Sequence, residues 1–160
     1  MLFRSIRHPV SASLRRTHMT SRLGNPVGDV ALPGAYRYAG KDPSAIPTEA
    51  PYLHNAYAWN FQVTRVMHYG CEVLGAAQYL EMSYEEVCAE PDRALAMVRS
   101  FLGCAHSQAG ASTRVDRART GAWGGSEARV QAIWAICGET AGRFGYALDP
   151  GAPRLAHPTR

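Results

Sequence analysis

The sequence predicts a small all-α protein: a bundle of three main helices and one short helix, with a long extended N-terminal arm and a short C-terminal tail. Three observations predict this fold. Apolar residues recur with a helical period over much of residues 52–149, no strand pattern competes with them, and proline and glycine gather ahead of them. With 160 residues, 46% of them apolar and 19% charged, the chain is expected to form one globular domain.

The N-terminal leader, residues 1–25, has the composition of a mitochondrial address. It holds five of the 17 basic residues and none of the 13 acidic ones, which leaves 12 against 13 in the rest of the chain. An Arg-rich, Ser-rich start without acidic residues is typical of a transit peptide. We therefore expect a mitochondrial protein whose body is nearly neutral, with the leader either cleaved or retained.

Residues 26–51 are expected to form an extended arm, because their many prolines and glycines disfavour a helix. Two interpretations stay open: a disordered linker, or an arm that lies on a neighbouring protein. The arm has few apolar side chains to offset an ordering cost of about 1–2 kcal/mol per residue. An ordered arm would therefore need a partner, whose pockets would receive aromatic anchors from the arm and the body, namely Tyr36, Tyr38, Trp59 and Trp123.

Two helices are predicted in the first half of the body, residues 52–149. A main helix begins near Tyr52, and one face of it carries an apolar stripe made of Val63, Val66, Met67, Gly70, Val73, Leu74 and Ala77. Ser83 and Glu86 have the spacing of a capping box, which predicts a short helix from Tyr84 toward Ala89.

Two further main helices complete the bundle. Pro91 suits the first turn of a helix that ends at Leu102 before Gly103, with an apolar face of Leu95, Val98, Phe101 and Leu102. Ser126 is expected to cap the last helix, which runs to about Leu148 before an extended tail, residues 150–160. Its stripe is Val130, Ile133, Trp134, Cys137, Ala141 and Phe144, and a row of small residues beside it predicts the close approach of another backbone at Gly138, Gly142 and Gly145.

The sequence assigns no catalytic, cofactor-binding or metal-ligating residue. The four cysteines form no Cys-x-x-Cys pair, and Cys137 falls on an apolar stripe, where we expect a buried thiol. A tetrahedral zinc site is a weak hypothesis, since its ligands would come from two loosely spaced pairs, His68 with Cys71 and Cys104 with His106. Acidic residues near the helix starts favour the helix dipole, with catalytic carboxylates the weaker alternative, at Glu85, Glu86 and Glu90.

A basic cluster lies in the predicted loop 105–125. Arg114, Arg117 and Arg119 suit a phosphate of RNA or of an anionic lipid, although a solvated loop is the favoured interpretation. A ribosomal protein usually carries basic residues throughout its body, and this body is nearly neutral. Nucleic acid is therefore the less favoured partner.

The best-supported role from sequence is a non-catalytic accessory subunit of a large mitochondrial assembly, with other protein subunits as its partners. We expect an inner-membrane respiratory chain or ATP synthase complex, a structural scaffolding role, and a position on the matrix side. No apolar stretch reaches the roughly 18–20 residues of a spanning helix, so no transmembrane segment is expected. Two alternatives remain: a mitochondrial ribosomal protein that contacts rRNA through the basic cluster, and a small zinc or thiol protein of the matrix.

Overall fold

The computed structural model describes most of the chain, namely residues 2–14, 28–47, 50–104 and 125–148. Over the described residues, 69% are helical and 8% lie in strands, which confirms the expected mostly helical fold. None of the helices in these ranges combines the length and the apolar character that a membrane span needs.

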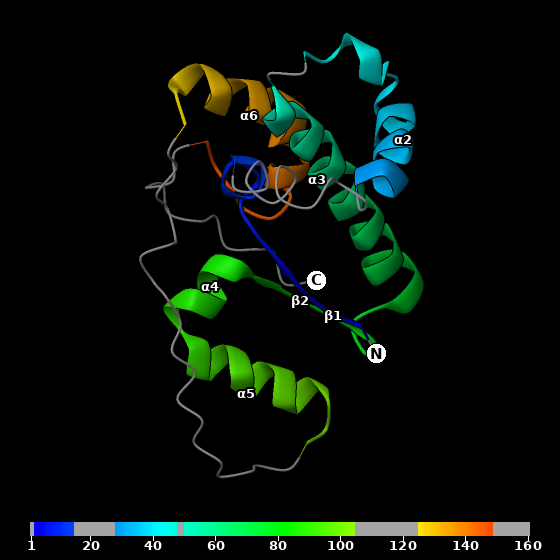
Figure 1. Cartoon of the computed structure of the whole chain (residues 1–160). Coiled ribbons are helices and arrows are strands. Elements are labelled where there is room, and N and C mark those ends of the chain that lie inside the picture. Colours follow the sequence, from blue (N-terminus) through cyan, green and yellow to red (C-terminus); the bar gives the residue numbers. More distant parts are fainter. Residues whose placement is uncertain (1, 15–27, 48–49, 105–124, 149–160) are drawn as a thin grey trace. The chain divides into compact units, whose positions relative to one another are not determined.

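The chain divides into two compact units. The strand unit comprises Met1–Arg7 and Val66–Ala122, and the helical unit comprises His8–Arg65 and Trp123–Arg160. Figure 1 shows the two strands beside α4 and α5 in the first unit, and α2, α3 and α6 in the second.

Two parallel strands form the sheet of the strand unit. β1 (Leu2–Ile6) pairs with β2 (Tyr79–Ser83), and the register places Arg4 opposite Glu81. The expectation that the chain has no strand was therefore wrong. Both strands have five residues, neither is rich in β-branched residues, and the pairing joins segments that lie far apart in sequence, so no local pattern reveals it.

The capping box at the start of α4 (Tyr84–Ala89) is confirmed. The backbone N–H of Glu86 donates to Ser83 Oγ over 3.0 Å, and the backbone N–H of Ser83 donates to Glu86 Oε2 over 3.2 Å. These two bonds satisfy amides that would otherwise lack helical partners. They begin α4 directly after β2, so the strand and the helix share one fixed corner.

α5 (Pro91–Phe101) also begins and ends where the sequence predicts. Pro91 lies in its first turn, and Gly103 follows it with a φ of 66°. The backbone N–H of Cys104 donates to the carbonyl of Arg99 over 3.0 Å, which closes the helix in a Schellman motif. A left-handed residue is required there, and glycine adopts it without steric cost.

A π-helix, η2 (His68–Leu74), continues α3 and shifts the predicted apolar stripe. Its wider turn is visible in the hydrogen bond from the backbone N–H of Gly75 to the carbonyl of Gly70, over 2.9 Å. Gly70 remains buried, but Val73 is 61% exposed. The prediction that Val73 lies on the buried face was wrong. It was based on 3.6 residues per turn throughout, and a π-helix has more residues per turn.

The helical unit is built around α3 (Pro51–Met67) and α6 (Glu127–Gly142). The thiol of Cys137 donates to the carbonyl of Ala56 over 3.4 Å, and the Thr140 hydroxyl donates to Asn60. The predicted α6 stripe is confirmed in its fully buried members, Ile133, Cys137, Ala141 and Phe144. The helix ends at Gly142, earlier than Leu148, because the chain turns through Gly145 with a φ of 70°.

At Gly138 and Gly142 the nearest described atoms do not belong to another backbone, which corrects the expectation for these two glycines. A Cβ at Gly138 would meet the Trp134 indole of the same helix at 2.8 Å, and one at Gly142 would have no described atom within 4 Å. Gly145 serves the turn that ends the helix. Gly138 and Gly145 therefore have separate local surroundings, and no described contact explains Gly142.

The prediction of an extended arm was wrong over Gly28–Ala39. These residues form helix α2, which has Pro33 inside it. An interior proline costs a helix about 3 kcal/mol, and the residues that follow Pro33 contact α3. Ala35 and Tyr36 are buried, and a Cβ at Gly34 would stand 3.2 Å from the Phe61 ring. This part of the arm therefore contacts the chain's own α3, whereas the sequence predicted contacts with a partner. The rest of the described arm is irregular apart from a 3₁₀ turn, η1 (Pro43–Ala45).

The described part of the leader belongs to both units. β1 lies in the strand unit, whereas a short helix over residues 9–14 lies in the helical unit. His8 Nε2 contacts the carbonyl oxygen of Ala147 at 3.0 Å, and its ring stacks on Trp134 with centroids 5.7 Å apart. Val10 is fully buried. These residues contribute core to the fold, so their loss would destabilise it.

Gly70 gives a direct test of the strand unit. A Cβ there would lie 2.5 Å from the Tyr79 ring, so we expect Gly70→Ala to lower the free energy of unfolding by about 1–3 kcal/mol. Gly142→Ala is the matched control, since nothing crowds that position and alanine favours helix. Urea unfolding of both variants measures the difference. Equal stability of the two variants would contradict the packing of Tyr79 on Gly70.

Candidate functional site

The candidate zinc ligands are only partly described. His68 Nδ1 lies 2.7 Å from Glu72 Oε2, Cys71 and Cys104 are exposed, and His106 lies outside the described residues. Within the described ranges, no group of three or more His, Cys, Asp or Glu side chains is placed to hold a metal ion. The zinc hypothesis stays untested because the position of His106 is not described. The other three proposed ligands, His68, Cys71 and Cys104, are not grouped to hold a metal ion.

The cysteines separate into two classes by burial. Cys88 and Cys137 are buried, Cys71 and Cys104 are exposed, and all four are thiols in the described structure. The predicted burial of Cys137 is confirmed, and burial raises the pKa of its thiol to about 12. A thiol with that pKa stays protonated at neutral pH and is a poor nucleophile.

Two of the four expected aromatic anchors belong to the core of the chain itself. Tyr36 and Trp59 are buried, so the expectation that they fill pockets of a partner was wrong. Tyr36 contacts His54 through its hydroxyl, and burial raises the Tyr36 pKa to about 12. Tyr38 is 54% exposed and lies beside the Phe61 ring. Trp123 lies outside the described residues, as does the basic cluster of Arg114, Arg117 and Arg119.

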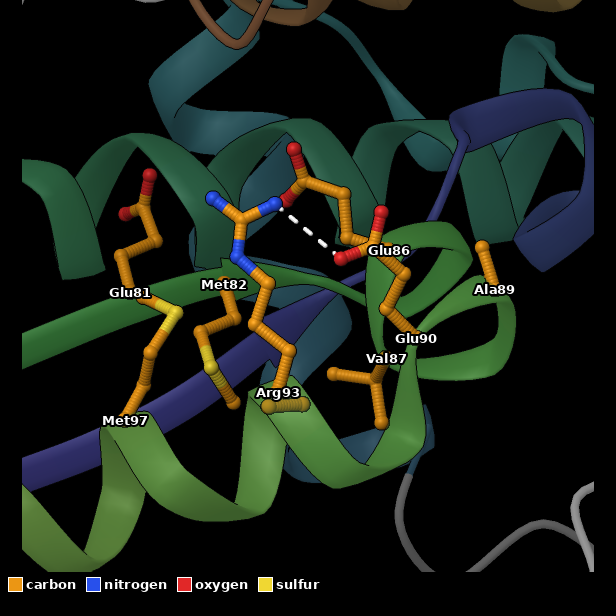
Figure 2. A pocket seen from close by; sticks show the side chains of 9 residues that line it. Glu81, Met82, Glu86, Val87, Ala89, Glu90, Arg93 and Met97 are labelled. Atoms are coloured by element: carbon orange, nitrogen blue, oxygen red, sulfur yellow. Dashed lines mark hydrogen bonds and ion pairs between the residues drawn. The ribbon is translucent and has the colours of Figure 1, made fainter.

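A cavity of about 150 Å³ opens within the strand unit between β2, α4 and α5. α5 contacts both of the other elements, and Glu90 makes the turn between α4 and α5 with φ −131° and ψ 66°. Because that turn is immediate, the two helices diverge from a common corner and leave space between them and the strand (Figure 2). The lining residues are Glu81, Met82, Glu86, Val87, Ala89, Glu90, Arg93, Ala94 and Met97.

The cavity has an apolar side and a charged side. Met82 and Ala94 are buried, Val87 is half-buried, and Met97 is 42% exposed. Figure 2 shows the Met82 and Met97 side chains next to each other in this view, from β2 and α5 respectively. Thioether side chains adapt their shape easily, which suits them to a binding surface.

The charged side holds three carboxylates and one guanidinium. Arg93 Nη1 donates to Glu90 Oε2 over 3.1 Å, and Figure 2 shows the guanidinium turned toward that carboxylate. Glu81 Oε2 accepts from the Tyr79 hydroxyl over 2.6 Å. Burial, followed by this contact with Glu81, raises the pKa of Tyr79, so its hydroxyl remains a donor at neutral pH.

Sequence reasoning placed Glu86 and Glu90 at helix starts and did not associate them with Glu81 or Met82. The residues that it missed come from β2, which the sequence did not reveal as a strand. One local signal was available. The apolar residues of α5 cover a wide arc that extends from Met97 to Leu95, more than a helix of this length needs for one small core.

Comparisons with known protein families, with curated proteins and with solved structures found no match to this chain.

The capping box at the start of α4, a helix that lines the cavity, should contribute measurably to the stability of the protein. Ser83→Ala removes the side chain that accepts from Glu86, and we expect it to lower the free energy of unfolding by about 0.5–2 kcal/mol. Ser126→Ala is the control, because Ser126 precedes α6 without a side-chain cap bond, and its effect should be smaller. Chemical denaturation compares the two. A larger loss for Ser126→Ala would contradict the assigned cap.

Thiol reactivity should follow burial. In the native protein we expect Cys71 and Cys104 to react rapidly with Ellman's reagent, whereas Cys88 and Cys137 react only after unfolding in urea. Mass spectrometry of the labelled peptides identifies the modified positions. Rapid native labelling of Cys137 would contradict its packing between α6 and α3.

Proposed function

We propose that this chain is a non-catalytic accessory subunit of a large mitochondrial assembly, of the inner-membrane respiratory chain or ATP synthase class. The observation that carries the proposal is the position of the large apolar side chains that are exposed to solvent. Six large apolar side chains are exposed among the described residues, and five of them lie in the strand unit: Tyr69, Val73, Leu95, Met97 and Leu102. Exposed large apolar side chains on one face of a helix favour binding to another protein, and three of these five lie on or next to α5.

α5 and its C-cap residue supply three of these five residues. Leu95 and Leu102 are seven positions apart, so they project from the same side of the helix, and they are 37% and 46% exposed. Ala94 is buried on the adjoining side. The helix thus buries one edge of its apolar arc within the strand unit and leaves the other edge open, which suits a helix with a second protein partner.

The mitochondrial part of the proposal rests on the composition of the leader. The fold supports the retained form of that leader, because residues 2–14 contribute a strand to one unit and core to the other. The Arg7 guanidinium lies 4.4 Å from the centre of the Tyr84 ring, which adds a cation–π contact. We therefore propose that the assembled protein keeps its N-terminus.

The proposal predicts that the exposed edge of α5 is needed for assembly. The tagged full chain is expressed in cells of its source organism, and the native mitochondrial complexes are separated by electrophoresis. Mass spectrometry then identifies the proteins in the band that contains the tagged chain. We expect co-migration with inner-membrane proteins, and we expect Leu95→Glu with Leu102→Glu to abolish it, because burying two carboxylates in an apolar interface is unfavourable. Ala96→Glu is the control, since Ala96 is exposed outside that edge.

Three results would overturn the proposal: migration as a free chain, co-migration with rRNA, or equal behaviour of the α5 variants. Circular dichroism of the purified variants checks that they remain folded. N-terminal peptide mapping of the assembled chain tests the retained leader separately, and a start beyond residue 25 would contradict it.

A further inference from the structure

We propose that α5 packs against the α5 helix of a second copy of this chain, in an antiparallel pair that places Asp92 of each copy beside Arg99 of the other. The inference rests on the proposed function, which makes α5 a docking helix, and it deepens that function by naming a second copy as the occupant. Three observations support it: the spacing of four exposed residues, the side of α5 on which they lie, and their charges.

Four residues on one face of α5 have the spacing of residues that contact a partner helix. They follow one another at intervals of three, four and three positions, and we call them the docking stripe: Asp92, Leu95, Arg99 and Leu102. Asp92 and Arg99 are exposed. The Leu95 and Leu102 side chains are 37% and 46% exposed. α5 therefore presents alternating charged and apolar side chains to solvent along one face.

The docking stripe lies away from the side of α5 that packs within the strand unit. α5 contacts α4 and β2, and Ala94 and Met97 line the cavity between these elements. At 3.6 residues per turn, these two side chains point about 100–160° away from Leu95. Figure 1 shows α4 and both strands on one side of α5. Packing on α4 and β2 therefore does not account for the apolar side chains of the docking stripe.

The charges of the docking stripe are complementary to those of an antiparallel second copy. Asp92 precedes Leu95 by three positions and Arg99 follows it by four, so a two-fold axis near Leu95 brings the acid of each copy opposite the base of the other. A parallel pair would place like charges together, which is unfavourable. Among the described residues, neither Asp92 nor Arg99 forms an ion pair within the chain. Both charges are therefore available to a partner.

A membrane surface is a less favourable occupant than a second copy. Recognition of anionic lipid usually needs a cluster of about four to eight basic residues, whereas the docking stripe carries one base and one acid. The helix pair is short, because a helix of 11 residues is about 16 Å long. Interfaces below about 1,200 Å² are typical of weak complexes. We therefore expect a weak dimer whose population rises with protein concentration.

Sedimentation equilibrium of the purified full-length chain, from micromolar to millimolar concentration, measures the dimer. We expect the average mass to rise from that of one chain toward that of two. Asp92→Arg and Arg99→Asp should each weaken dimerisation about five- to thirtyfold, because each places like charges together at two symmetric positions. Ser100→Asp is the matched control, since Ser100 is exposed on α5 outside the docking stripe, and it should leave dimerisation nearly unchanged. Circular dichroism checks that every variant remains folded.

Complementary variants test the contact between Asp92 and Arg99 directly. The Asp92→Arg chain has two bases on the docking stripe and the Arg99→Asp chain has two acids, so a mixture of the two chains should form a heterodimer. The double variant, Asp92→Arg with Arg99→Asp, exchanges the acid and the base and should largely recover the dimer. Local damage to α5 by either substitution would give no such recovery.

Several outcomes would overturn the inference. They are a monomer at every concentration, a dimer that both charge reversals leave intact, and a mixture of the reversed chains that forms no heterodimer. Binding of the monomeric chain to vesicles of phosphatidylcholine and phosphatidylglycerol, with loss of binding in Arg99→Asp, would also overturn it and assign the docking stripe to a membrane.

The failure of this inference is distinguishable from the failure of the proposed function. A chain that is monomeric in isolation but still co-migrates with inner-membrane proteins would leave the accessory role in place, with another subunit on α5. A dimer that migrates free of any larger complex would overturn the accessory role alone.

Discussion

The parallel pairing of β1 with β2 is the constraint on which the strand unit depends. It holds Tyr79 and Glu81 in a fixed register, with Ile6 and Ser83 at the far end. Tyr79 packs over Gly70 on one side, and α4 begins at Ser83 through its capping box. The cavity wall formed by β2 and α4 is therefore a consequence of a backbone ladder whose other strand lies at the N-terminus. A five-residue strand contributes few hydrogen bonds, so packing at Gly70 and capping at Ser83 are needed to hold it.

The apolar side and the charged side of the cavity have different structural origins. Its apolar side follows from the amphipathic pattern of α5 and from Met82, which the strand orients inward. Its carboxylates arise from helix starts, where acidic residues are favourable for the helix dipole. Local helix chemistry thus places Glu86 and Glu90 at one corner, and only the tertiary fold adds Glu81 beside them. The grouping of Glu81 with Glu86 and Glu90 is a product of the fold, since Glu81 comes from β2 and the other two come from helix starts.

The helices that carry their own start and stop chemistry were predictable from sequence. Ser83, Pro91 and Gly103 fix α4 and α5 within one residue of their expected bounds. Features that depend on distant partners were not predictable. Pro33 predicted a break in any helix, but α2 forms there, and Tyr36 of α2 packs against His54 and Tyr57 of α3. The π-helix is a comparable case, since Val73 continues an apolar pattern whose period the backbone does not keep. The cavity required β2, and the sequence signal for that strand was too short to recognise.

The N-terminal arginines illustrate how one composition can serve two purposes. Arg4 lies opposite Glu81 in the strand register, and the Arg7 guanidinium lies over the Tyr84 ring, so both belong to the strand unit as well as to an address-like charge pattern. The remaining leader arginines, Arg15, Arg16 and Arg22, lie outside the described residues. Composition alone predicts a targeting role for the leader, whereas contacts place part of it within the fold. The proposed targeting role and the observed role in folding are compatible, because a chain that enters a compartment unfolded can form β1 from the same residues afterwards.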